Sequence, residues 1–234
     1  MMLETALVLL HVVAGIFALV LAPVAMATRK GGRAHRLGGR VYFWAMAVLF
    51  VTALGLLAVR PNVFLLIISV LSFYGAFSGY RVLSRKRPQA EQGATWLDWG
   101  GAWVALAAGV GFIAWGALTL LDVWESAIPT AFSFLGVGFG TLLGREAWSD
   151  LTSFRQPPAD PNWWWFYHMD RMLGSYVAAV TAFMVQTVGP RLPSGLEWTV
   201  WIAPALVGGP LIGVWIGHYK KRFSARPRVG KAKA

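Results

Sequence analysis

The 234-residue chain contains no cysteine. Without thiols it cannot form disulfides, thiolate metal sites or iron–sulfur clusters, and it has no cysteine nucleophile. It also lacks Ser-His-Asp, Walker and HExxH signatures. Whether the chain is an enzyme therefore stays open at the level of sequence.

Charge is also scarce. Asp, Glu, Lys and Arg make up 13% of the residues, whereas soluble domains contain about 25%. Hydrophobic residues make up 57% of the chain, and a helix of about 20 apolar residues spans a bilayer. We predict seven spans, at residues 5–27, 41–59, 63–80, 99–121, 128–143, 172–188 and 198–217. The fold class is all-α, a polytopic transmembrane helix bundle.

The remaining residues are too few for a separate soluble domain. We expect one seven-helix transmembrane domain over residues 1–219 and a basic, disordered cytoplasmic tail over 220–234. No basic residue precedes the first apolar run, whereas Arg29 and Lys30 follow it. This order favours a retained first span over a cleaved signal peptide.

The basic residues give an orientation. Nineteen of the 21 Lys and Arg residues fall after spans 1, 3 and 5 or in the tail, and only Arg60 and Arg191 fall on the other side. Short loops rich in Lys and Arg stay in the cytoplasm. We expect a multi-pass protein of the bacterial cytoplasmic (inner) membrane with its N-terminus outside. The net charge of +11 then indicates contact with the bilayer and its anionic cytoplasmic lipids, and no nucleic acid partner.

Small residues recur at four-residue spacing in several spans: Gly75/Gly79, Gly136/Gly140/Gly144, Gly174/Ala178/Ala182 and Gly209/Gly213/Gly217. This spacing lets helices approach closely in lipid. We interpret it as packing within one bundle, with a homodimer or a partner membrane protein as the alternative.

The four histidines are the most informative polar residues. His11 lies inside the first span, where an ionisable side chain is a functional candidate or a hydrogen-bonding partner of another helix. His35, His168 and His218 fall on the cytoplasmic side, where imidazoles can bind a metal or ligate haem. His35 and His168 are the metal candidates, and His218 is interpreted as an interfacial residue.

Two segments contain the candidate binding residues. The first loop carries His35, Arg36 and Arg40 among four glycines, and arginine can grip an anion with two hydrogen bonds. The start of the sixth helix carries His168, Asp170 and Arg171. The spacing places His168 and Arg171 on one helix face. We predict that both face a polar pocket at the cytoplasmic end, close to the first loop, with Asp150 or Asp170 as a charge partner of the arginines.

These two segments also carry a resemblance. The runs His35-Arg36-Leu37-Gly38-Gly39-Arg40-Val41-Tyr42 and Arg171-Met172-Leu173-Gly174-Ser175-Tyr176, with a histidine in the first span, resemble an uncharacterised family of predicted bacterial membrane proteins (domain of unknown function 2306). The resemblance implies a seven-helix type of membrane domain and supplies no activity.

Three functions are compatible with these features. The first is a membrane binding or accessory protein with a His/Arg/Asp pocket that opens to the cytoplasm. The second is a membrane redox subunit that binds haem or a quinone, for which the histidines, 13 Trp and 6 Tyr are available. The third is a small-molecule transporter, although acidic residues and broken-helix pairs are rare within the spans.

The orientation is testable with reporter fusions at the C-terminus. A reporter that is active only in the periplasm should give no signal, because the basic tail resists translocation. A reporter that is active only in the cytoplasm should give a strong signal. The reverse pattern would overturn the predicted orientation.

Overall fold

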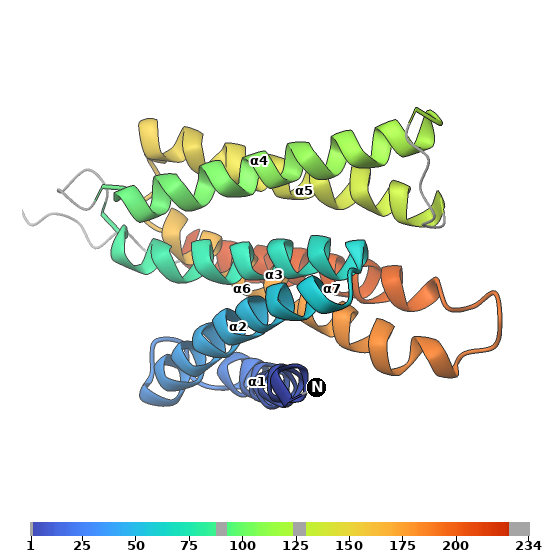
Figure 1. The fold of residues 1–234 in the computed structure, drawn as a ribbon. Helices are drawn as coiled ribbons and strands as arrows, with labels where there is room; N and C mark the ends of the chain where they lie inside the picture. Colours follow the sequence, from blue (N-terminus) through green and yellow to red (C-terminus); the bar gives the residue numbers. More distant parts are fainter. Residues whose placement is uncertain (1, 88–92, 124–129, 225–234) are drawn as a thin grey trace, which may run out of the picture.

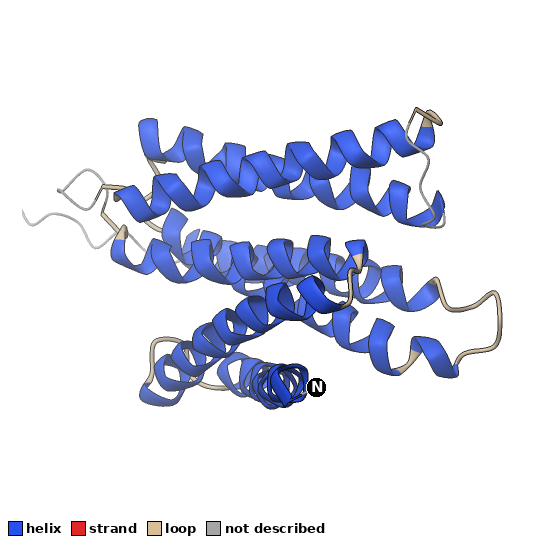
Figure 2. Ribbon diagram, in the orientation of Figure 1, coloured by secondary structure: helices blue, strands red, loops and turns tan. Residues whose placement is uncertain are grey.

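The computed structural model describes residues 2–87, 93–123 and 130–224, and within these ranges it consists of helices joined by turns and loops, with no strand (Figure 2). Its elements are α1 (Met2–Ala27), α2 (Arg33–Val59), α3 (Val63–Arg81), η1 (Val82–Ser84), α4 (Trp96–Leu120), α5 (Thr130–Arg155), α6 (Trp163–Thr187), η2 (Gly189–Arg191) and α7 (Thr199–Ser224). The predicted all-α class is confirmed.

Six of the helices are long and apolar enough to cross a membrane, namely α1, α2, α3 with η1, α4, α6 with η2, and α7. This composition indicates a multi-pass membrane protein. Within the described residues α5 is not among the six. Its apolar part ends at Leu143, just before Arg145 and Glu146, and glycines lower its mean hydropathy. The predicted fifth span begins at residues 128 and 129, which lie outside the described residues.

Several helices extend beyond the predicted spans. α2 begins at Arg33, so most of the predicted first loop is helical. α6 begins at Trp163, after Asn162, whose side chain makes no capping hydrogen bond. α7 continues to Ser224, whereas tail residues 225–234, which include Arg226, Arg228, Lys231 and Lys233, lie outside the described residues. The apolar runs predict only what enters the hydrocarbon core, whereas these helices continue past it into polar sequence.

The helices form three layers (Figure 1). α4 and α5 pair on one side, α3, α6 and α7 form the middle, and α1 and α2 pair on the other side. One buried apolar cluster joins α3 to α4, α5 and α6, and a second joins α1 and α2 to α3 and α6. The α1–α2 connection, the end of α3 and the α5–α6 connection lie at the same end of the bundle (Figure 1).

Glycines bring α4 and α5 into backbone contact. A Cβ atom added to Gly140 would lie 2.8 Å from the carbonyl oxygen of Gly109, and one added to Gly136 would lie 2.9 Å from the Trp115 ring. A Cβ added to Gly109 would lie 2.8 Å from the backbone nitrogen of Gly144. The predicted close packing of Gly136, Gly140 and Gly144 is therefore confirmed.

Of the other small-residue stripes, the one in α3 packs closely against a helix and the one in α7 does not. Gly75 and Gly79 of α3 face α6, where an added Cβ would lie 3.1 Å from Ser175 Cβ and 2.9 Å from Arg171 Cβ respectively. An added Cβ atom would meet no described residue within 4 Å at four other glycines: Gly174, Gly209, Gly213 and Gly217. Packing within one bundle is therefore wrong for the α7 stripe, because no described residue lies within 4 Å of a Cβ atom on that face of α7.

The α4–α5 contact generates a stability prediction. Gly140→Leu should lower the thermal unfolding temperature in detergent, because its side chain would push into the Gly109 backbone and cost about 1–3 kcal/mol or more. Gly138→Leu is the matched control, since a Cβ at Gly138 would meet nothing within 4 Å. Equal melting of the two variants would contradict the contact.

Candidate functional site

The site begins where α1 turns into α2. Gly31 has a φ of +74°, a conformation that favours glycine, and it reverses the chain after α1. The Lys30 ammonium donates hydrogen bonds to the carbonyl oxygens of Met26 (2.5 Å) and Ala25 (3.3 Å), at the negative end of the α1 dipole. Partial burial lowers the pKa of Lys30 below its ordinary value. A cation is thereby fixed beside the turn, 4.9 Å from the Trp215 ring of α7.

Two histidines face each other from different helices. His35 of α2 donates from Nδ1 to the carbonyl oxygen of Ala25 (3.0 Å), and His168 of α6 donates from Nδ1 to the carbonyl oxygen of Gly79 (2.7 Å). The second bond depends on the close approach of α3 to α6 at Gly79. The two ring centroids are 6.3 Å apart, with an interplanar angle of 76°.

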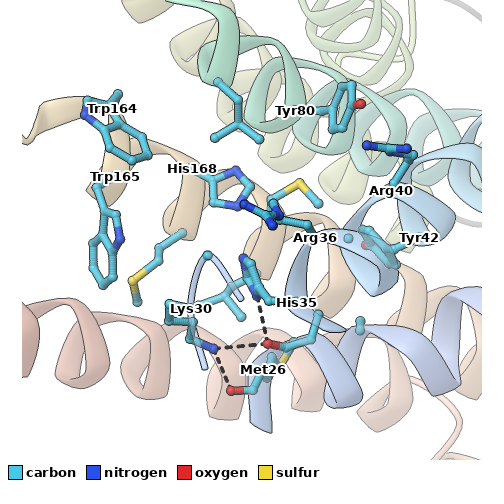
Figure 3. Close-up of a pocket in the computed structure, with 18 of the residues that line it drawn as sticks. Met26, Lys30, His35, Arg36, Arg40, Tyr42, Tyr80, Trp164, Trp165 and His168 are labelled. Carbon is cyan, nitrogen blue, oxygen red and sulfur yellow. Dashed lines mark hydrogen bonds between the residues drawn. The ribbon is translucent and has the colours of Figure 1, made fainter. Parts of the chain in front are cut away.

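These elements enclose a cavity of about 540 Å³ (Figure 3). Its polar lining includes His35, Arg36, Arg40 and His168, which stand around one space in Figure 3. Aromatic and methionine side chains form most of the remaining walls: Met26, Tyr42, Tyr80, Trp164, Trp165, Met169, Met172 and Trp215. Lys30 and Lys86 add two further cations. Among the described residues no carboxylate lines the cavity, so an anion would meet no repulsion from these walls.

The structure separates the predicted site residues into two groups. His35, Arg36, Arg40 and His168 line the cavity together, whereas Asp170 is exposed on α6 and does not line it. Arg171 is 5% exposed and points into the bundle on another side of α6. One turn of α6 thus contributes to two different sites. His168 and Arg171 are three residues apart, so their side chains point in directions that differ by about 60° around the helix axis.

Arg171 belongs to a buried charged cluster between α5 and α6. Its Nη2 atom donates to Asp150 Oδ1 (3.0 Å) and to the Glu146 carbonyl oxygen (2.9 Å), and its Nη1 atom contacts the Glu146 carboxylate. The hydroxyl groups of Tyr74 and Tyr167 donate to the two oxygens of Asp150. The expected pairing of Asp150 with Arg171 is confirmed, and the site is a structural ion cluster more than an open pocket.

The remaining ionisable candidates lie elsewhere. The Nδ1 atom of His11 is 2.8 Å from the hydroxyl of Thr52, so this histidine joins α1 to α2. His218 is exposed on α7 and does not line the cavity. In the described part of the chain, no three His, Asp or Glu side chains come together as a metal centre would need.

Sequence reasoning missed several of the lining residues. The four-residue spacing of Trp164 and His168, and of Trp165 and Met169, could have placed these side chains on the cavity face of α6. Trp215 carries no such signal, because α7 contributes it from a distant part of the chain. Glu146 was also missed as the second partner of Arg171.

Fold and site together define a helical, multi-pass type of membrane protein with a cation-lined apolar cavity at one end of its bundle. No family model, curated protein or solved structure matches the chain. The resemblance to the family of predicted bacterial membrane proteins stays a prediction, because these comparisons do not bear on it.

The buried cluster predicts a large stability effect. Arg171→Met would leave the Asp150 and Glu146 carboxylates buried without a cation, which should cost about 3–5 kcal/mol of unfolding free energy. Thermal unfolding followed by tryptophan fluorescence measures the loss. Adding Asp150→Asn should restore part of it, and Arg145→Met, at an exposed arginine of α5, should change little. An unchanged melting temperature in Arg171→Met would mean that the carboxylates reach water.

Proposed function

We propose that the chain is a binding protein of the bacterial inner membrane, with its N-terminus outside and its cavity at the cytoplasmic face. The distribution of Lys and Arg supports this orientation. α5 is proposed to cross the membrane as well, because it stays in backbone contact with α4 from Gly109 to Gly116. Seven crossings place the two termini on opposite sides.

The proposed ligand class is an amphipathic anion, that is, an apolar body with an acidic group. The observation that carries this proposal is the lining of one cavity by four cations and many aromatic and methionine side chains. Burial of apolar ligand surface against these walls would supply most of the affinity, at about 25 cal/mol per Å². The cations would select the sign of the charge and orient the ligand.

Arg36 and Arg40 are suited to this role. Both side chains are exposed at the cavity, and neither makes a hydrogen bond or an ion pair with another described residue. Their charge therefore stays available to a ligand, unlike that of Arg171, which two carboxylates neutralise. A guanidinium can bind a carboxylate or phosphate with two parallel hydrogen bonds.

A membrane redox subunit is the second candidate, and one observation favours it. The His35 and His168 rings face each other across the cavity with their centroids 6.3 Å apart. No comparable observation favours a transporter.

Binding is testable with the full-length protein in nanodiscs and two fluorescent probes, dansyl-undecanoate and its uncharged alcohol analogue. The Arg36→Gln/Arg40→Gln variant should bind the carboxylate about tenfold or more weakly, because two charge-assisted contacts are lost. Its affinity for the alcohol should stay within about twofold of the parent. Fluorescence titration corrected for empty nanodiscs measures both affinities.

Arg33→Gln provides the matched control, since Arg33 is exposed in the same turn of α2 but does not line the cavity. A loss of carboxylate affinity in this control equal to that of the double variant would remove the role of Arg36 and Arg40. Equal affinity of the parent for both probes would contradict an anionic ligand.

A further inference from the structure

The hydrogen bonds of the two facing histidines determine which ring nitrogen carries the proton. A carbonyl oxygen can only accept, so the Nδ1 atoms of His35 and His168, bonded to Ala25 and Gly79, each hold a hydrogen. In the neutral ring the other nitrogen, Nε2, then carries the lone pair that can bind a metal. Metal-binding histidines have this arrangement, because a carbonyl bound at Nδ1 orients the ring and makes Nε2 more basic.

The separation of the rings favours one coordination geometry. A metal–nitrogen bond is about 2.0 Å, so two imidazoles on opposite sides of one metal have centroids about 6 Å apart. On a tetrahedral metal the centroids would lie closer, at about 5 Å. The observed 6.3 Å matches the opposed arrangement, and the rings of His35 and His168 lie one above the other in Figure 3.

Opposed axial histidines leave the metal's equatorial positions for another ligand. No third His, Asp or Glu among the described residues completes the site. A planar tetrapyrrole supplies four equatorial nitrogens, an apolar ring and two carboxylates. The cavity offers aromatic and methionine walls for the ring, and Lys30, Arg36, Arg40 and Lys86 for the carboxylates, within about 540 Å³.

We propose that this cavity binds haem, with His35 and His168 as the two axial ligands. This inference rests on the proposed function, because haem is an amphipathic anion of the class named there. In the view of Figure 3 the Arg36 side chain appears between the two rings, and it lines the same cavity. It has no partner in the described chain, so on binding it turns aside and pairs with a haem carboxylate. With both axial positions filled by protein, the iron has no open position, which suits electron transfer.

The test is a titration of the purified full-length protein with hemin, followed by visible absorption before and after reduction with dithionite. The parent should bind one hemin per chain and give the sharp bands of six-coordinate, low-spin haem. His35→Ala and His168→Ala should each lose that spectrum and bind hemin about tenfold or more weakly. His218→Ala is the matched control, at an exposed histidine that does not line the cavity, and it should behave as the parent.

Metal-free protoporphyrin IX separates ligation from folding. It has the same ring and carboxylates but no iron, so properly folded His35→Ala and His168→Ala variants should bind it as tightly as the parent does. Hemin spectra that are identical in the parent and both variants would overturn axial ligation. Histidine-dependent binding of zinc or copper, together with no histidine-dependent hemin spectrum, would overturn it too.

The same experiments distinguish the two proposals. If dansyl-undecanoate or protoporphyrin IX binds in a manner that depends on Arg36 and Arg40, and hemin gives no histidine-dependent spectrum, the anion-binding function stands and the haem proposal fails. If none of the three probes binds, both proposals fail.

Discussion

Where α3 passes α6, Gly75 and Gly79 let the two backbones approach until an added Cβ atom would meet Ser175 or Arg171 at about van der Waals distance or less. In lipid no hydrophobic effect drives helices together, so small residues that permit such contact decide which faces meet. This contact sets the position of α6 within the bundle. It brings the Gly79 carbonyl to His168 on one side of α6 and places Arg171 beside α5 on another.

The two polar regions that meet at α6 differ in charge balance. Around Arg171, two carboxylates neutralise the guanidinium and two tyrosine hydroxyls donate to Asp150, so the charges of the cluster are paired within the protein. Around His168, the cavity gathers cations, and its described lining contains no carboxylate. Burying unpaired charge is costly, and Arg36 and Arg40 of this lining are exposed, so water or an anion can pair with them. The first region holds the fold, and the second is available for function.

A third contact, between α4 and α5, explains why hydropathy is a poor guide to α5. Glycines lower the apolar character of this helix, yet they are the residues that let it lie against Gly109 and Gly116 of α4. The residues that reduce its apparent affinity for lipid are those that bind it to its neighbour. A measure of hydropathy counts transfer into lipid and takes no account of helix packing.

Composition and the order of apolar runs determined the all-α class and the approximate positions of most helices, because lipid allows few other ways to satisfy backbone hydrogen bonds. The four-residue spacing of Gly136 and Gly140 predicted that they face a helix, but the same spacing at Gly209 and Gly213 meets no described residue within 4 Å, so the contact with α4 was decided by packing. Spacing also placed His168 and Arg171 on one face, but a helix face is broad, and only packing decided that His168 borders the cavity while Arg171 is buried against α5. Tertiary structure likewise decided which carbonyl groups bind His35 and His168, and that Trp215 of α7 lines the cavity. Each of these contacts joins segments that no local periodicity connects.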